Sequence, residues 1–68
     1  MDKIQKSAVE LANMIRRRLA LPKLRIGIYP NSSGWHATVY AEGGSARDLQ
    51  TRVNEIVQEL NALYDLAD

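Results

Sequence analysis

Hydrophobic and polar residues alternate along the middle of the chain, from Leu24 to Ala41. The apolar positions of this segment are Leu24, Ile26, Ile28, Trp35, Ala37, Val39 and Ala41. A period of two predicts two half-buried β-strands, over about residues 24–29 and 35–41. The segment between them, from Pro30 to Gly34, is rich in turn-forming residues. We therefore expect a β-hairpin.

On both sides of this hairpin the apolar residues recur every three to four positions, which predicts two amphipathic helices. The first is expected over about residues 2–20, with Asp2 and Gln5 as a capping pair. Pro22 disfavours helical geometry at Leu21, so this helix should end there or just before. The second is expected over about residues 45–65, beginning at Ser45. Its apolar stripe contains Leu49, Val53, Ile56, Leu60 and Leu63.

These elements predict one α+β domain over residues 1–68, with the order α-β-β-α and both helices on one face of a two-stranded antiparallel hairpin. A two-stranded sheet is marginally stable alone, and both of its edges are open. We therefore expect a homodimer in which two hairpins join into a four-stranded antiparallel sheet. The sequence leaves open which strand forms the joining edge. The regular stripe of the second helix suits packing between helices at that junction.

The size of the chain supports this expectation. A chain of 68 residues is close to the lower limit for a domain that folds without disulfides, metals or a second copy. It contains no cysteine and one histidine, which excludes disulfides and a structural zinc site within one chain. We expect no cofactor. Hydrophobic residues make up 46% of the sequence and charged residues 25%, which is typical of a folded globular protein.

The sequence also gives an expectation about location. Its first residues lack the apolar core of a secretion signal, and no segment approaches the roughly 18 apolar residues of a membrane span. The first predicted helix is basic and amphipathic, but Ala8 and Ala12 in its stripe favour close packing on a sheet over membrane insertion. We therefore expect a cytoplasmic protein that does not bind membranes.

The polar side of the predicted hairpin is the best candidate for a binding surface. It carries Arg25, Tyr29, His36, Thr38 and Tyr40. Tyrosine and arginine are enriched where proteins dock. Alternatively, these residues form cross-strand pairs that only stabilise an exposed sheet face.

Basic residues provide a second candidate surface, although the formal net charge is only +1. They gather at the end of the first predicted helix and the start of the first strand: Arg16, Arg17, Arg18, Lys23 and Arg25. Such a cluster is the alternative hypothesis, a nucleic-acid-binding surface. However, a turn of about 100° per residue spreads three consecutive arginines around a helix. At a helix end they also complement the helix dipole.

The sequence does not indicate catalysis. His36 is the one side chain whose ordinary pKa lies near neutrality, and no acid is placed to complete a triad with Ser32 or Ser33. Gly43 and Gly44 lack the spacing of a phosphate-binding loop. We therefore expect a non-enzymatic protein-interaction or regulatory module. Its expected partners are a second copy of the chain and another protein, with nucleic acid as the alternative.

Overall fold

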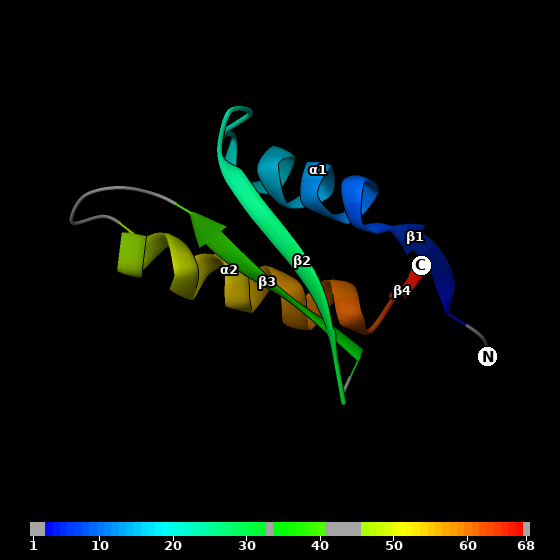
Figure 1. Cartoon of the computed structure of the whole chain (residues 1–68). Coiled ribbons are helices and arrows are strands. Elements are labelled where there is room, and N and C mark those ends of the chain that lie inside the picture. Colours follow the sequence, from blue (N-terminus) through cyan, green and yellow to red (C-terminus); the bar gives the residue numbers. More distant parts are fainter. Residues whose placement is uncertain (1–2, 33, 41–45, 68) are drawn as a thin grey trace.

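The computed structural model describes residues 3–32, 34–40 and 46–67, which contain two helices and four strands (Figure 1). In chain order the elements are β1 (Ile4–Ser7), α1 (Ala8–Leu19), β2 (Arg25–Asn31), β3 (Gly34–Tyr40), α2 (Ala46–Asn61) and β4 (Tyr64–Ala67). β2 and β3 form an antiparallel hairpin, whereas β1 and β4 form a parallel pair. The protein is thus a compact α+β fold with the order β-α-β-β-α-β.

The hairpin predicted from the alternating segment is confirmed. Its register runs from Arg25 opposite Tyr40 to Asn31 opposite Gly34. The strands therefore differ by one or two residues from the predicted bounds, and Ala41 lies outside the described residues. Gly34 has a φ of 135°, which a residue with a Cβ adopts only with strain. This explains why glycine stands at the point where the chain enters β3.

The two sides of the hairpin differ as the alternation predicts. Trp35 and Ala37 of β3 are buried, and Ile26 and Ile28 of β2 are half-buried against the same core. Successive residues of a strand point to opposite faces, so the polar residues between them lie on the other side of the hairpin.

The N-terminal segment differs from the helix predicted over residues 2–20, because Ile4–Ser7 forms a strand. The N-cap is Ser7, whose Oγ accepts the backbone N–H of Glu10 at 3.2 Å, while Oε1 of Glu10 accepts the N–H of Ser7 at 3.3 Å. This reciprocal capping box begins α1 later than the predicted pair of Asp2 and Gln5. Asp2 itself lies outside the described residues. The Ser7 N–H bond, with the Ser7 hydroxyl, lowers the pKa of Glu10 below its ordinary value.

α1 ends at Leu19, where Pro22 predicts it to end. Ala20 follows in the left-handed conformation with a φ of 59°. The N–H of Leu21 then donates to the carbonyl of Arg16 at 3.0 Å. These features are typical of a helix C-cap, in which carbonyls of the last turn find donors beyond the helix.

The C-terminal segment also differs from the prediction, because α2 ends at Asn61 instead of about residue 65. Leu63, which the sequence placed in the apolar stripe, follows the helix and is 58% exposed. Tyr64–Ala67 forms β4, which pairs with β1 from Ile4 opposite Tyr64 onward (Figure 1). The indole N–H of Trp35 donates to the carbonyl of Tyr64 at 3.1 Å. This bond attaches the parallel pair to the hairpin.

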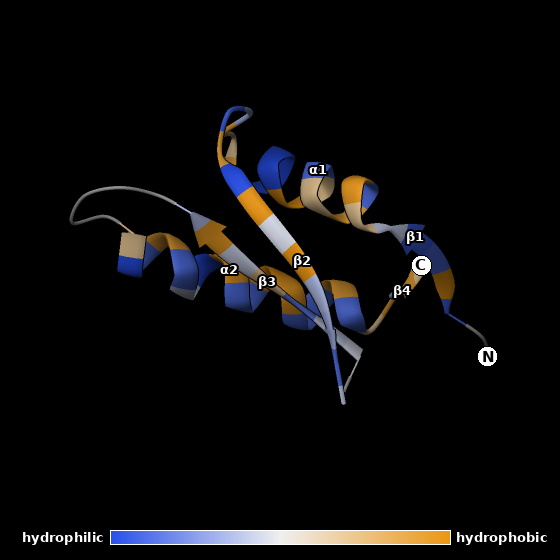
Figure 2. Ribbon diagram, viewed as in Figure 1, coloured by the Kyte–Doolittle hydropathy of each residue, from blue (hydrophilic) through white to orange (hydrophobic). Residues whose placement is uncertain are grey.

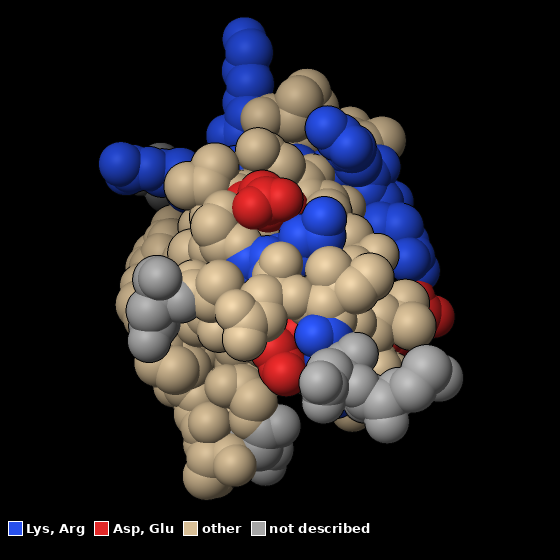
Figure 3. Space-filling model, turned by 90° about the vertical axis from the view of Figure 1, so that its right-hand side faces the viewer, with Lys and Arg blue, Asp and Glu red and all other residues tan. Residues whose placement is uncertain are grey.

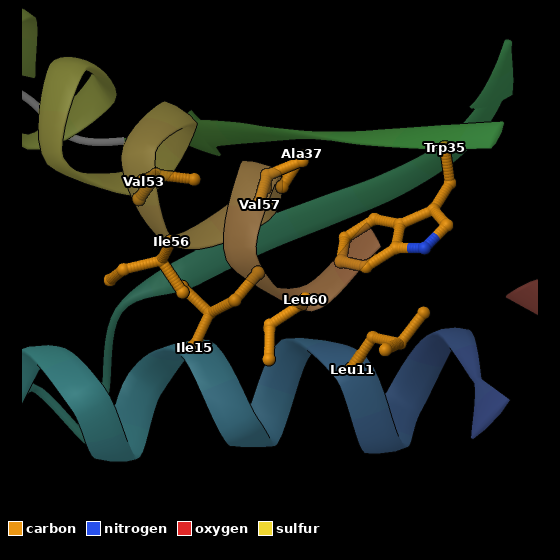
Figure 4. Close-up of a cluster of buried hydrophobic side chains, with 8 residues drawn as sticks. All are labelled: Leu11, Ile15, Trp35, Ala37, Val53, Ile56, Val57 and Leu60. Carbon is orange, nitrogen blue, oxygen red and sulfur yellow. The ribbon is translucent and has the colours of Figure 1, made fainter. Parts of the chain in front are cut away.

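The core lies between the two helices and the apolar side of the hairpin (Figure 4). Its buried members are Leu11, Ile15, Trp35, Ala37, Val53, Ile56, Val57 and Leu60. Of the residues that α2 contributes, Val53, Ile56 and Leu60 come from the predicted stripe, and Val57 lies beside it. They pack with residues of α1 and β3 of the same chain. The buried members of this stripe therefore belong to the core of one chain, and a role of the stripe at a junction between two copies stays a prediction.

Both helices are amphipathic in the way this core requires. Figure 2 shows the hydrophobic side of each helix turned inward and its hydrophilic side turned away. Leu11, Ala12 and Ile15 are the buried residues of α1. No helix in the described part of the chain is long and apolar enough to cross a membrane.

Candidate interaction surface

The polar side of the hairpin, here called the outer face, consists of Arg25, Gly27, Tyr29, His36, Thr38 and Tyr40. The register pairs Arg25 with Tyr40 and Tyr29 with His36. The structure therefore brings all five predicted partner-binding residues onto one surface. Tyr29 and Tyr40 are 42% and 53% exposed.

Tyr29 crosses this face diagonally. Its hydroxyl forms a hydrogen bond with the hydroxyl of Tyr40, which raises the pKa of Tyr40 above its ordinary value. A Cβ on Gly27 would lie 2.6 Å from the Tyr29 hydroxyl oxygen, so the absence of a side chain there lets the ring lie over the strand. His36 stacks beside Tyr29, with 5.6 Å between the ring centroids and a tilt of 34°. The outer face is thus an ordered aromatic surface.

The six residues of the outer face include hydroxyl, imidazole and guanidinium groups but no carboxylate. Nδ1 of His36 lies 3.4 Å from Nδ2 of Asn31, which places an amide beside the imidazole where a triad requires a carboxylate. Among the described residues there is no group of three or more histidine, cysteine, aspartate or glutamate side chains that could hold a metal ion. The hydroxyls, imidazole and guanidinium of the outer face can donate and accept hydrogen bonds and stack on a partner.

The outer edge of β3 is closed by two side-chain amides of α2. Gln50 accepts the N–H of Val39 at 2.9 Å and donates to the carbonyl of Ala37 at 3.0 Å. Asn61 accepts the N–H of Trp35 at 3.3 Å and donates to its carbonyl at 2.9 Å. Each amide thus replaces the donor and acceptor that a neighbouring strand would offer. Protection of this kind prevents further strand pairing at β3.

These bonds also determine which groups of β2 point outward. In an antiparallel pair, the backbone N–H and C=O groups of successive residues alternate. Those of one residue bond the residue opposite, and those of the next residue point away from the neighbouring strand. The backbone groups of Trp35, Ala37 and Val39 point away from β2. The backbone groups of the residues opposite them therefore point away from β3. Those residues are Pro30, Ile28 and Ile26. We call the outward backbone groups of Ile26 and Ile28 the open edge, because no hydrogen bond to them is found in the described part of the chain.

The open edge is short and has a defined limit at each end. Beyond Ile26, the N–H of Leu24 donates to the carbonyl of Leu21 at 3.1 Å, and its own carbonyl accepts Nε of Arg16 at 2.6 Å. Beyond Ile28 comes Pro30, which has no N–H to donate. The groups available for pairing are therefore the N–H and C=O of Ile26 and Ile28, with the carbonyl of Pro30.

A shallow groove runs beside the open edge, between β2 and α1. It has a volume of about 180 Å³ and is lined by Ala8, Val9, Ala12, Arg16, Ile26 and Ile28. Val9 is 69% exposed. The small side chains of Ala8 and Ala12 leave room for an apolar group to approach β2 from this side. The edge thus combines free backbone groups with an adjoining apolar surface.

The basic residues predicted as a nucleic-acid surface lie in different surroundings. Arg16 is held by the Leu24 carbonyl and by Oδ1 of Asn13, and Arg18 pairs with Glu59. Arg25 lies on the outer face of the hairpin, whereas α1 packs on the other face, and Arg17 and Lys23 are exposed. Lys and Arg side chains lie around the upper part of the end shown in Figure 3, with acidic side chains between and below them.

The sequence pattern does not reveal the residues that distinguish the two edges. Gln50 and Asn61 belong to no motif, and Arg16 is predicted only as a member of the basic cluster. Their role depends on where each helix lies beside a strand, and no local pattern reports that position. The one available signal is that long polar side chains sit next to buried positions of an amphipathic helix.

Comparisons with protein-family models, with curated proteins and with solved structures find no match to this chain.

Proposed function

We propose that this protein is an interaction module that acts as a homodimer. In this proposal, β2 of one copy pairs with β2 of a second copy through the open edge. The two hairpins then form a continuous four-stranded antiparallel sheet. Its outer face presents Arg25, Tyr29, His36, Thr38 and Tyr40 twice to a further protein, and the module acts by binding rather than by catalysis.

The difference between the two strand edges is the observation that supports this proposal. β3 has its outward groups bonded by Gln50 and Asn61, whereas β2 leaves those of Ile26 and Ile28 open. Unprotected edges attract strand pairing, and natural proteins cover or disrupt the edges that must stay single. A chain that covers one edge with side chains and leaves the other free is organised for pairing on the free side.

The energetics of a small domain favour the same assembly. A single core in a chain of this size rarely supplies more than about 3–5 kcal/mol. An isolated two-stranded sheet is marginal, and three or more strands with one apolar face are more stable. Pairing through β2 would bond the open backbone groups and cover the groove beside Val9. Because only the folded chain can pair in this way, dimerisation would stabilise the folded chain by mass action.

The proposal is tested by removing one donor of the open edge. Ile28→Pro deletes the outward N–H of Ile28 and leaves the bonds between β2 and β3, because Ile28 does not bond its partner Ala37. Ile28→Ala is the matched control, because it loses the same side-chain contacts but keeps the N–H. Circular dichroism establishes that both variants are folded, and light scattering on a sizing column gives their masses.

We expect the unaltered chain and Ile28→Ala to have a mass near twice 7.6 kDa. Ile28→Pro is expected to be a folded monomer. A monomeric unaltered chain at all concentrations would contradict the proposal. So would a dimer that Ile28→Pro leaves as tight as Ile28→Ala does, because pairing would then not use this edge.

A further inference from the structure

The geometry points to one register for the paired edges, with Gly27 on the two-fold axis and Arg25 of each copy against Tyr29 of the other. This inference rests on the proposed homodimer and specifies its interface. In this register Ile26 lies opposite Ile28 of the second copy, and the symmetric pair repeats the arrangement. Each such pair exchanges both of its N–H···O bonds, as hydrogen-bonded pairs of antiparallel strands do.

Hydrogen bonding excludes the register in which Ile26 faces its own symmetry mate. Ile28 would then face Leu24 of the second copy. The N–H of Leu24 is already bonded to Leu21, and its carbonyl to Arg16. The backbone groups of Ile28 would be covered without partners, which is costly when water is excluded.

The opposite shift, in which Ile28 faces its own symmetry mate, fails for a different reason. It places Ile26 against Pro30 of the second copy. Because proline has no N–H, the carbonyl of Ile26 would remain without a donor. Shifts by a single residue are excluded by the pleat, since they turn the apolar side of one strand to the outer face of the other. The register centred on Gly27 alone bonds all the outward groups of Ile26 and Ile28.

Side chains on the outer face fit the same register. Arg25 lies opposite Tyr29 of the second copy in a pair that does not exchange hydrogen bonds, where side chains approach most closely, with about 4.5 Å between Cα atoms. On the hairpin side, the Tyr29 ring is already flanked by His36. The second copy would lie on the other side of β2, where its Arg25 guanidinium can stack on the ring. Gly27 at the axis adds no side chain of its own beneath the Tyr29 ring.

Cysteine pairs can test this register because the chain has no cysteine of its own. The variant carrying both Arg25→Cys and Tyr29→Cys places the two thiols opposite each other across the interface. A disulfide needs Cα atoms within about 7 Å. The single variants are the matched controls, because a residue and its own symmetry mate would be offset by four residues, or about 13 Å along the strand.

We expect the double variant to form a covalent dimer under mild oxidation, while each single variant stays at the mass of one chain in a denaturing gel. A measurement on the unaltered protein accompanies this test, so that loss of the Tyr29–Tyr40 bond cannot obscure the result. In an equimolar mixture of isotope-labelled and unlabelled chains, filtered NMR should give intermolecular contacts between the Arg25 side chain and the Tyr29 ring.

The outcomes separate the register from the proposed function. A dimer in solution that shows neither the cross-link nor the Arg25–Tyr29 contacts overturns the register and leaves the homodimer standing. A dimer that cross-links equally well through a single cysteine also overturns the register. A chain that is monomeric at the highest concentration overturns both.

Discussion

Removing the Gln50 side chain is the sharpest test of how the β3 edge is closed. Gln50 accepts from Val39 at 2.9 Å and donates to Ala37 at 3.0 Å, and it also donates to Oδ1 of Asn54 at 2.8 Å. Gln50→Ala deletes all of these bonds and leaves the strand groups facing solvent. Asn54→Ala is the matched control, because it removes only the exposed bond between the two side chains.

The expected loss follows from the bonds to the strand. Each hydrogen bond between neutral groups contributes about 0.5–1.5 kcal/mol net, so losing both strand bonds lowers the free energy of unfolding by about 1–3 kcal/mol. The higher helix propensity of alanine returns a few tenths of this. With a urea dependence of about 1 kcal/mol per molar for a small protein, the unfolding midpoint should fall by roughly 1–3 M.

The assay is urea unfolding at one fixed protein concentration, followed by the fluorescence of Trp35, which is 1% exposed in the folded chain. Asn54→Ala should shift the midpoint little, since surface changes rarely exceed about 0.5 kcal/mol. Opening the β3 edge should also produce species larger than a dimer on a sizing column. A Gln50→Ala midpoint equal to that of Asn54→Ala, with no larger species, would refute the view that Gln50 closes this edge.

Three further perturbations test the core, the first helix and the outer face. Ile56→Asp should abolish helical circular dichroism, because it places an unpaired charge in the core and costs more than the whole domain supplies; a folded variant would place Ile56 outside the core. Ser7→Ala should cost about 1 kcal/mol in thermal unfolding at neutral pH. Because the pKa of Glu10 is lowered, its contribution to stability is present above the ordinary glutamate pKa and is lost as the pH falls through the lowered value. Ser7→Ala removes the hydroxyl and keeps the backbone N–H that lowers this pKa most, so it should flatten part of the acid-side loss; an unchanged pH profile would exclude a contribution from the hydroxyl. Tyr29→Phe should return the raised pKa of Tyr40 toward about 10, seen as tyrosinate absorbance appearing at lower pH. A group whose pKa is raised on folding contributes stability that is present below its pKa in the unfolded chain and is lost as the pH rises through its pKa in the folded chain. The unaltered chain should therefore lose more stability in alkali than Tyr29→Phe. Identical titrations of the two proteins would contradict the hydrogen bond between the hydroxyls.

The hairpin and the core could be predicted because their signals are local. Alternation over residues 24–41 sets both strands and the buried side, and the buried positions of α2 follow from its helical period. The edge of β3 could not be assigned in the same way. Gln50 and Asn61 look like ordinary polar residues of a helix until the helix is placed beside Trp35, Ala37 and Val39.

The ends of the chain could not be predicted for a related reason. Ile4 continues the spacing of the α1 apolar residues, so the segment Ile4–Ser7 reads as helix. The capping box of Ser7 and Glu10 was a local signal that competed with the one at Asp2. The strand β4 has no clear alternation of its own, and it forms because β1, from the opposite end of the chain, pairs with it. Parallel pairing between such distant segments leaves little trace in the local pattern.

Amide hydrogen exchange at the open edge is a direct test of pairing between two copies of β2. Within the described residues, the backbone amides of Ile26 and Ile28 have no hydrogen-bond partner, and the proposed pairing of β2 with β2 would give them one. By NMR we expect both amides to exchange slowly at high protein concentration and to lose this protection on dilution. The amide of Val39, which Gln50 bonds within the chain, should stay comparatively protected at both concentrations. Exchange of Ile26 and Ile28 at the rate of exposed loop amides, whatever the concentration, would contradict the account.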